Sequence, residues 1–365
     1  MKLAVVGGGV CGLSACIELE KRFPKATITL FEGSPKLGGK VGTIYKDGFL
    51  IEEGPDSLNA QKEETARLIE DPIIPKTNFC YLLGEGKIEF SKLKKANVEP
   101  SFKKTLREYV SEAYGENLVP LFAGVYGGDP DRVSSLVLHG RRVESPWGVP
   151  FVGPRMGMGS IVQKLRSEIK KTEIVHQKVS EITENGNVDG ILFDGVVSAC
   201  PNPPYKWDLL DRIPKASAAI VTLETEKLTD KYGSGVICRE NGISGATFSS
   251  VKWEGRAPEG KGLSRVFFYD LGGNIEEKAK DFLQELGIKS YRILLKRTWE
   301  NEIRIHTMEA IETMWLILDM SEIVQFGSIL SSGIPDAVDS GRCAAGRLAN
   351  VLFGDKYGKR DYTWN

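Results

Sequence analysis

The beginning of the chain carries a glycine-rich turn between a strand pattern and a helix pattern. Lys2 to Val6 has the apolar character of a short buried strand, and Gly7 to Gly12, reading GGGVCG, is its turn into a helix. A second strand pattern, Thr27 to Phe31, ends in Glu32. This order of strand, glycine turn, helix, strand and acid predicts a Rossmann-type βαβ unit.

Each part of this unit has a physical reason to bind a dinucleotide. Gly7 permits the tight turn, Gly9 lets a pyrophosphate approach the backbone, and Gly12 lets the helix pack closely on the strand. The helix start offers amide N–H groups and a positive dipole end to phosphates. Glu32 can accept hydrogen bonds from a ribose. We therefore expect a bound dinucleotide.

The segment after Glu32 distinguishes between dinucleotides. A nicotinamide domain would usually continue into another helix, but Gly33 to Thr43 is too rich in glycine and proline for a helix interior. Gly38 and Gly39, followed by Lys40, suit a second loop around an extended cofactor, with the lysine near the phosphates. This arrangement favours FAD over NAD. The alternative is a glycine-rich surface turn.

Length and charge bound the class of protein. At 365 residues the chain exceeds what one hydrophobic core usually supports, and its 41% hydrophobic and 27% charged residues are ordinary for a globular protein. The formal net charge of -1 gives no reason to expect a nucleic-acid partner. No apolar run is long enough for a transmembrane segment, although peripheral membrane contact stays open.

Cysteine and histidine usage predicts no disulfide framework and no metal site. The six cysteines form no Cys-x-x-Cys pair, and no secretory signal peptide precedes them, so we expect reduced thiols in a cytoplasmic protein. His139, His176 and His306 lack metal-ligand spacing.

Along the rest of the chain, periodicity predicts helices and strands in an order that leaves and returns to the nucleotide-binding pattern. Helices are expected over 62–70, 101–139, 161–170, 276–286 and 335–353, a hairpin over 81–90, and strands over 173–179, 188–193, 195–199, 216–224, 245–251 and 264–269.

This order predicts an α/β fold with a discontinuous Rossmann-like FAD-binding domain. We expect that domain to comprise residues 1–80, 155–210 and 318–365. An inserted α+β substrate-binding domain would comprise 211–317, and a small helical subdomain would comprise 81–154.

Several further segments, spread in order along the chain, indicate a family. They read EEGPDSL at 52–58, LFAGVYGGDPDR at 121–132, RMGMGS at 155–160, TFSSVKWEGRAPEG at 247–260 and GIPDAVDSGR at 333–342. With the glycine turn and Glu32, they resemble FAD-dependent protoporphyrinogen oxidases and their coproporphyrinogen-oxidising relatives, within the flavin amine-oxidase superfamily.

The resemblance implies a set of residues around non-covalently bound FAD. Amides at the start of a helix beginning near Gly333 would lie beside the flavin ring and stabilise its anionic reduced form. The implied cofactor-binding residues are Gly7, Gly9, Val10, Cys11, Gly12, Glu32, Gly38, Gly39, Lys40, Gly54, Pro55, Val179, Gly327, Ser328, Ile334, Pro335 and Ala337.

The resemblance also implies a reaction in haem biosynthesis. The enzyme would remove hydrides from protoporphyrinogen IX or coproporphyrinogen III, giving the porphyrin, with oxygen as the acceptor. Candidate contacts to this small tetrapyrrole-like substrate are Asp56 and Arg155. Asp56 reads equally well as a turn residue after Pro55. The pair Arg141 and Arg142 could meet substrate carboxylates, or it could be a solvated surface pair.

Two departures from the family keep other functions open. The chain is shorter than family members, and 76–79 reads KTNF where some members carry a propionate-binding arginine. The alternatives are a flavin desaturase or amine oxidase, or a non-catalytic FAD-binding protein with a reduced substrate domain. Against an amine oxidase, no paired tyrosines lie near Gly327 and no cysteine is placed for covalent flavin attachment. The oligomeric state is not indicated.

Overall fold

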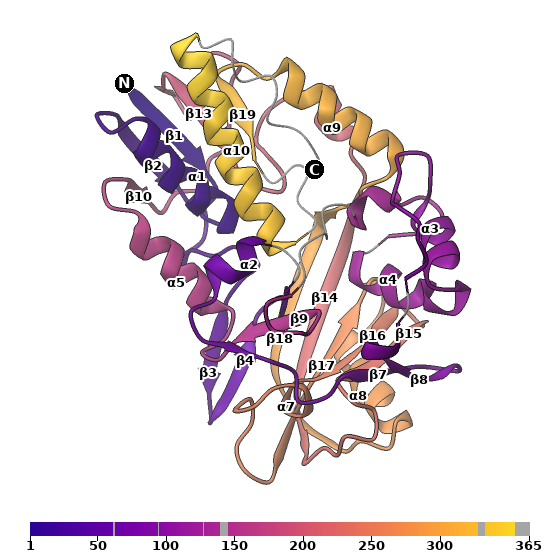
Figure 1. Cartoon of the computed structure of the whole chain (residues 1–365). Coiled ribbons are helices and arrows are strands. Elements are labelled where there is room, and N and C mark those ends of the chain that lie inside the picture. Colours follow the sequence, from indigo (N-terminus) through magenta and orange to yellow (C-terminus); the bar gives the residue numbers. More distant parts are fainter. Residues whose placement is uncertain (61–62, 94, 127, 139–144, 328–332, 355–365) are drawn as a thin grey trace.

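The structure is a computed structural model that describes residues 1–365 except 61–62, 94, 127, 139–144, 328–332 and 355–365. Two β-sheets organise the chain, one parallel and one mainly antiparallel. In Figure 1 the parallel sheet and its helices occupy the upper part of the molecule, and the second sheet extends below.

The parallel sheet has the strand order β10-β2-β1-β13-β19. Its strands come from three distant parts of the chain: β1 (Lys2–Val6), β2 (Thr27–Phe31), β10 (Glu173–Val175), β13 (Gly195–Ser198) and β19 (Val324–Phe326). Every pairing among them is parallel. The Rossmann-like domain is therefore discontinuous in sequence, as predicted.

The side chains of β1 point alternately to the two faces of this sheet, and helices cover both faces. Leu3 and Val5 point into a core shared with α1 (Val10–Arg22), α5 (Gly159–Glu168) and α10 (Ile334–Phe353). Ala4 and Val6 point into a second core with α6 (Asp208–Asp211) and α9 (Met308–Met320). Successive side chains of a strand face opposite ways, so buried strands like this one are apolar throughout.

The second sheet has the order β18-β14-β17-β16-β15-β7-β8, and its pairings are antiparallel except that of β15 with β7. The helix α8 (Ile275–Glu285) packs on one face. The strands are β7 (Phe79–Leu82), β8 (Gly86–Glu89), β14 (Lys215–Glu226), β15 (Gly235–Glu240), β16 (Ile243–Phe248), β17 (Lys261–Phe268) and β18 (Ser290–Arg304).

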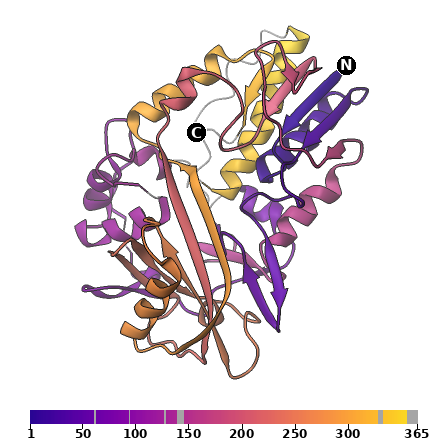
Figure 2. The same ribbon diagram turned by 180° about the vertical axis from the view of Figure 1, so that it is seen from behind.

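Two long strands connect the parts of the molecule. Strands β14 and β18 both belong to the second sheet, pair along nearly their whole length, and extend up toward the parallel sheet (Figure 2). A side chain near the end of β18 can therefore reach the nucleotide-binding turns although the whole strand belongs to the second sheet.

Smaller elements complete the described chain. They are the hairpin β3 (Thr43–Lys46) and β4 (Phe49–Glu52), the strands β5 (Leu58–Asn59), β6 (Pro72–Ile73) and β9 (Phe151–Pro154), the hairpin β11 (Asn187–Val188) and β12 (Ile191–Leu192), the helices α2 (Glu63–Leu68), α3 (Leu106–Ala113), α4 (Val119–Tyr126) and α7 (Ser249–Lys252), and 3₁₀ turns at Phe90–Lys92, Glu116–Leu118 and Ser135–Leu138.

The structure refines several sequence predictions. The helical stretch expected over 101–139 is divided, because α3 ends before Gly115, which has a φ of 108°. The expected strand over 188–193 is a tight hairpin. The hairpin predicted at the start of the helical subdomain, β7 and β8, joins the second sheet. Strand β18 and helix α9 have no counterpart in the sequence predictions.

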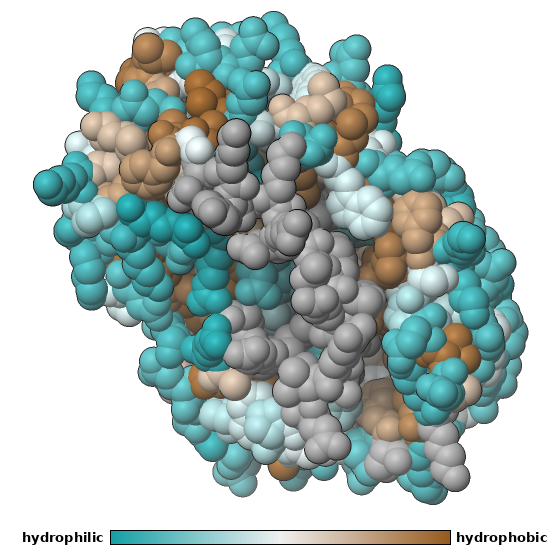
Figure 3. Space-filling view, turned by 45° about the horizontal axis from the view of Figure 1, so that its top comes forward, coloured by the Kyte–Doolittle hydropathy of each residue, from teal (hydrophilic) through white to brown (hydrophobic). Residues whose placement is uncertain are grey.

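Among the described residues, no helix combines the length and apolar character needed to cross a bilayer. The face shown in Figure 3 is mostly hydrophilic, with hydrophobic side chains in small separate groups.

Candidate functional site: a dinucleotide cradle and a buried charge cluster

The glycine turn after β1 packs as the sequence predicts. Gly7 has a φ of 106°, which favours glycine, and a Cβ on Gly12 would lie 1.8 Å from the Gly7 carbonyl oxygen. Gly9 is the N-cap of α1, no side chain caps this helix, and its first turn contains no acid. The N-cap residue thus makes no side-chain bond to the first turn of α1, and that turn carries no acid, which suits an anion.

The second glycine loop lies directly against the first. The Gly38 amide donates to the Gly8 carbonyl at 2.9 Å, and a Cβ on Gly39 would lie 3.4 Å from the Cα of Gly9. Gly38 and Gly39 both have positive φ. Two loops predicted to wrap one pyrophosphate thus meet backbone to backbone. The residues present fit a dinucleotide, although their contacts with it stay a prediction.

Glu32 is fixed at the end of β2 by backbone amides. Its Oε2 accepts from the Gly8 amide and its Oε1 from the Ser34 amide, both at 2.7 Å. A carboxylate offers about four acceptor positions, so capacity remains for a ribose hydroxyl. The carboxylate is placed beside the glycine turn, where the predicted ribose contact requires it.

Other predicted cofactor residues gather at the same edge. The Gly327 amide donates to the Ser198 carbonyl, and a Cβ on Gly327 would lie 2.6 Å from the Cys11 sulfur. Val179 is buried among the side chains that cover the opposite face of the parallel sheet. The helix α10 begins at Ile334, with Gly333 as N-cap and Pro335 in its first turn, and packs on α1. Ser328 falls outside the described residues.

Gly54 and Pro55 approach the cradle from β4. A Cβ on Gly54 would lie 2.0 Å from the Lys40 carbonyl oxygen and 3.8 Å from the ring of Trp299. The Glu53 amide donates to the Gly42 carbonyl at 2.8 Å. The second glycine loop and the Gly54–Pro55 turn therefore form one continuous wall.

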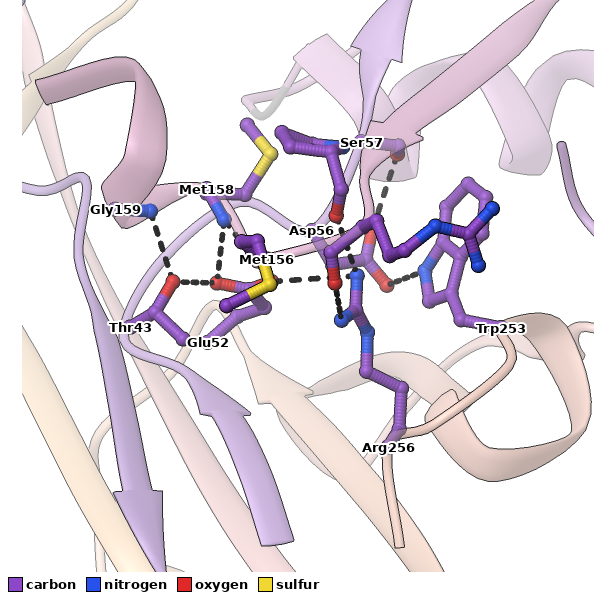
Figure 4. Close-up of polar contacts among 12 residues, drawn as sticks. Thr43, Glu52, Asp56, Ser57, Met156, Met158, Gly159, Trp253 and Arg256 are labelled. Atoms are coloured by element: carbon purple, nitrogen blue, oxygen red, sulfur yellow. Dashed lines mark hydrogen bonds and ion pairs between the residues drawn. The ribbon is translucent and has the colours of Figure 1, made fainter. Parts of the chain in front are cut away.

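Asp56, a predicted substrate contact, is buried in a charge cluster (Figure 4). Its carboxylate lies 2.9 Å from the Lys252 ammonium and 3.7 Å from the Arg265 guanidinium, and accepts from the Trp253 indole at 3.4 Å. Burial alone would raise the pKa of Asp56, but Lys252 and Arg265 outweigh burial and hold it below its usual range. In this position Asp56 is an internal ion-pair partner, and its substrate role stays a prediction.

The second acid of the cluster is Glu52, at the end of β4. It accepts from the Thr43 hydroxyl at 2.6 Å and from the Met158 amide at 3.1 Å (Figure 4). Burial raises the pKa of Glu52, and these bonds together with Arg256 and Arg265 oppose the increase. Glu52 thus ties the β3–β4 hairpin to the start of α5.

Arg155, the other predicted substrate contact, lies on the surface. Its guanidinium is 2.8 Å from Asp71 and 3.4 Å from Glu254, and all three side chains are at least half exposed. The pair Arg141 and Arg142 falls outside the described residues. The structure thus places Asp56 inside the protein and Arg155 outside, and does not bring them to one cavity.

Sequence reasoning missed the residues at the end of β18. Glu302 forms an ion pair with Lys40 at 2.9 Å, and Arg304 donates to the Pro201 carbonyl at 2.8 Å. Burial lowers the pKa of Arg304, while Cys200 and Cys11 oppose the decrease. The signal in the sequence is the short apolar run at 293–295, and the charged residues that follow it obscure the strand pattern.

The site contains the parts needed to hold a cofactor and few groups for acid-base chemistry. Amides, glycines and the Glu32 carboxylate line the cradle, and the described acids beside it, Glu52, Glu53, Asp56 and Glu302, each form an ion pair. Such a site suits chemistry carried by a bound cofactor, with the protein supplying orientation and electrostatics.

Two family models match the chain. Residues 5–71 match the NAD(P)-binding Rossmann-like domain, and residues 81–304 match the flavin containing amine oxidoreductase family. The second match covers more than half of the chain and bears out the predicted superfamily.

Similar proteins carry porphyrinogen oxidase names. A coproporphyrinogen III oxidase of Bacillus subtilis is 23% identical over 464 residues, covering 96% of this chain and 98% of the relative. One from Staphylococcus aureus is 24% identical over 76% of this chain and 80% of the relative. The 464-residue alignment is longer than this chain, so the Bacillus protein contains segments that this chain lacks.

Solved structures share the fold over nearly the whole chain. A protein from Exiguobacterium, provisionally assigned as a protoporphyrinogen oxidase, superposes with a TM-score of 0.76 at 20% identity, covering 95% of this chain and 98% of that one. Cyclohexylamine oxidase from Brevibacterium oxydans superposes with a TM-score of 0.69 at 14% identity, covering 96% of this chain and 99% of that one. The chain is thus an FAD-dependent oxidoreductase, and it belongs to the flavin-containing amine oxidoreductase family.

Proposed function

We propose that this enzyme is a porphyrinogen oxidase of haem biosynthesis that uses oxygen as electron acceptor. The observation that carries the proposal is the relationship to the Bacillus coproporphyrinogen III oxidase, which extends over 96% of this chain and 98% of that protein. The cradle of glycine loops, helix α1 and Glu32 supports the cofactor that such a reaction requires.

Coproporphyrinogen III is the preferred substrate of the two. Relatives named coproporphyrinogen III oxidase match 96%, 76% and 80% of this chain. A protoporphyrinogen oxidase of Arabidopsis thaliana matches 64%. The coproporphyrinogen relatives therefore align with more of this chain than the protoporphyrinogen oxidase does.

The chemistry needs three two-electron oxidations. Bound FAD would accept the hydride removed from a reduced bridge of the macrocycle at each step. Oxygen would then take up that hydride together with the one proton that the substrate loses in the same step, and would leave as hydrogen peroxide. The amides of α1 and the Gly38–Gly39 loop would hold the pyrophosphate, and Glu32 the ribose. The Gly54–Pro55 turn and the start of α10 would orient the ring.

A wall for the substrate is available on the second sheet. Phe267 of β17, Ala218 of β14 and Trp299 of β18 lie on the sheet face that looks toward Gly54, and all three are half-buried. Flat apolar side chains suit a macrocycle, and a dry surface protects the reaction from water. We propose that the porphyrinogen lies against this wall.

The domain boundaries remain part of the proposal. We assign residues 1–80, 155–210 and 318–365 to FAD, 211–317 to substrate binding and 81–154 to a helical subdomain. Under this division β14 and β18 carry the substrate wall toward the cofactor.

The test is an aerobic assay of the FAD-loaded protein. Coproporphyrinogen III and protoporphyrinogen IX are supplied separately, and porphyrin fluorescence and peroxide are followed against autoxidation. We expect the faster rate with coproporphyrinogen III and three peroxides for each porphyrin. A matched control is Gly12→Ala, whose added Cβ would meet the Gly7 carbonyl and should abolish FAD retention.

The other outcomes of the assay identify the alternatives. A flavin-loaded protein that oxidises neither porphyrinogen above autoxidation overturns the proposal. Reduction of its flavin by a primary amine or a polyene would then support an amine oxidase or a desaturase. Retention of FAD without reduction by any of these substrates would support a non-catalytic flavoprotein.

A further inference from the structure

The side chain of Arg265 links the second sheet to the predicted flavin wall. Arg265 lies in the middle of β17, yet its Nη2 donates to the Gly54 carbonyl and its Nη1 lies 3.7 Å from Asp56. Its side chain is only 1% exposed. A residue of the second sheet therefore determines the direction of a peptide group next to Pro55.

Neighbouring groups also restrict where Gly54 can lie. The Lys40 carbonyl and the ring of Trp299 flank the Gly54 Cα, and even one methyl group there would collide with Lys40. Steric contact thus fixes where Gly54 lies, and the bond from Arg265 fixes how its carbonyl points. Both restraints act on the turn that precedes Asp56.

Burying an arginine at position 265 has a cost in folding free energy. Its Nε and Nη1 have no hydrogen-bond partner, and burial lowers the pKa of Arg265 while Asp56 and Glu52 oppose the decrease. Buried unsatisfied donors and charges weaken a fold, and well-packed apolar residues often serve stability better. The stability of the core therefore does not by itself account for an arginine here.

We propose that Arg265 is a positioning residue that holds the Gly54–Pro55 turn against the flavin ring. The proposal rests on FAD as the cofactor and on the predicted contact of this turn with it, and it does not depend on which substrate is oxidised. Asp56 then serves as the counter-ion that makes a buried guanidinium tolerable, with Lys252 and Trp253 completing its contacts.

Arg256 provides a matched control within the same cluster. It is equally buried, lies 3.8 Å from Glu52, and has an unsatisfied Nε. Its donors, however, bond to the Pro154 and Arg155 carbonyls, which belong to neither glycine loop nor to the Gly54 turn. The two arginines thus match in burial and charge but differ in what they hold.

The experiment compares Arg265→Gln, Arg265→Lys and Arg256→Gln in the full chain reconstituted with FAD. The measurements are the FAD dissociation constant by fluorescence quenching, the visible flavin spectrum and the melting temperature of the apoprotein. We expect Arg265→Gln to weaken FAD binding about tenfold and to shift the flavin bands, since a bond to a charged donor is lost. Arg256→Gln should lower the melting temperature similarly but leave affinity and spectrum unchanged.

Conservative replacement separates positioning from folding. Arg265→Lys retains the charge beside Asp56 and should fold, with part of the FAD affinity restored. If Arg265→Gln does not fold, Gly54→Ala moves the same turn from its other side and should reproduce the spectral shift. Wild-type affinity and spectrum in a folded Arg265→Gln or in Gly54→Ala, or an equal FAD defect in Arg256→Gln, would overturn the proposal.

Discussion

Lys40 and Glu302 form an ion pair in which the ammonium lies 2.9 Å from the carboxylate. The contact joins the second glycine loop to the end of β18. Each side chain is about one-third exposed, with 31% and 36% of its surface accessible. The sequence predicts that Lys40 lies near the cofactor phosphates. The ion pair gives Lys40 a second role, that of joining the loop to β18, and mutation can separate the two roles.

Lys40→Met and Glu302→Gln should therefore have opposite effects on FAD binding. If Lys40 serves the phosphates, Lys40→Met weakens binding, while Glu302→Gln releases the lysine and preserves or strengthens it. Dissociation constants measured at low and high salt provide the readout. Equal weakening in both variants would show that only the ion pair matters.

The packing of α10 on α1 predicts contrasting effects for two glycines of one helix. A Cβ on Gly341 would lie 2.1 Å from the Cys11 carbonyl oxygen, whereas one on Gly346 would meet only the Arg22 side chain, at 3.6 Å. Gly341→Ala should cost about 2 kcal/mol through overpacking. Gly346→Ala should gain up to about 1 kcal/mol from helix propensity. The free energies of unfolding of both variants can be measured in urea. Equal changes in the two variants would contradict the prediction.

Removing the charge of Asp56 should destabilise the fold. Asp56→Asn leaves the buried Arg265 and the partly buried Lys252 beside a neutral group, and such a change costs about 3 kcal/mol. We expect a lower melting temperature in the apoprotein, before any substrate is present. Unchanged stability with a raised KM would instead favour the substrate contact predicted from the sequence.

Arg155 should contribute little to the stability of the fold or to substrate binding. Its ion pairs with Asp71 and Glu254 are exposed, and exposed pairs are screened by solvent. Arg155→Ala is expected to leave the melting temperature within experimental error and KM unchanged. A several-fold rise in KM for coproporphyrinogen III, reversed by Arg155→Lys, would establish the substrate role.

His306 should make stability depend on pH. Burial lowers its pKa from 6.5 to about 4, with Arg304 adding to the decrease and Asp336 opposing it. The unfolded chain therefore binds a proton between pH 6.5 and about 4 that the folded chain does not, so stability falls as pH falls through this window. Between pH 7 and pH 4.5 the free energy of unfolding of His306→Gln should therefore fall by about 2 kcal/mol less than that of the unsubstituted protein. Parallel unfolding curves for the two proteins would contradict this.

The N-terminal unit was predictable because its signals are local. Gly7, Gly9 and Gly12 have fixed spacing and short-range steric roles, and Glu32 follows its strand directly. The α10 helix was predictable from Pro335 and the small residues on one side. The fold class follows from such segments, since each carries its own reason to form.

The remainder depends on contacts between distant segments. Strand β18 reads as polar sequence because it lies at the edge of its sheet, and pairing with β14 makes it a strand. Arginine is usually exposed to solvent, so the sequence alone predicts that Arg256 and Arg265 lie on the surface. Their ion-pair partners, Glu52 and Asp56, are what allow them to be buried. No local pattern reveals a pairing across two hundred residues.

The order of the parallel sheet has a consequence for synthesis on the ribosome. Strands β1 and β2 emerge first, but β19 and the covering helix α10 come from residues beyond 323. The nascent chain must therefore carry an uncovered apolar side of α1 while most of the polypeptide is translated. The native core around α1 can therefore close only after the last part of the chain has been made.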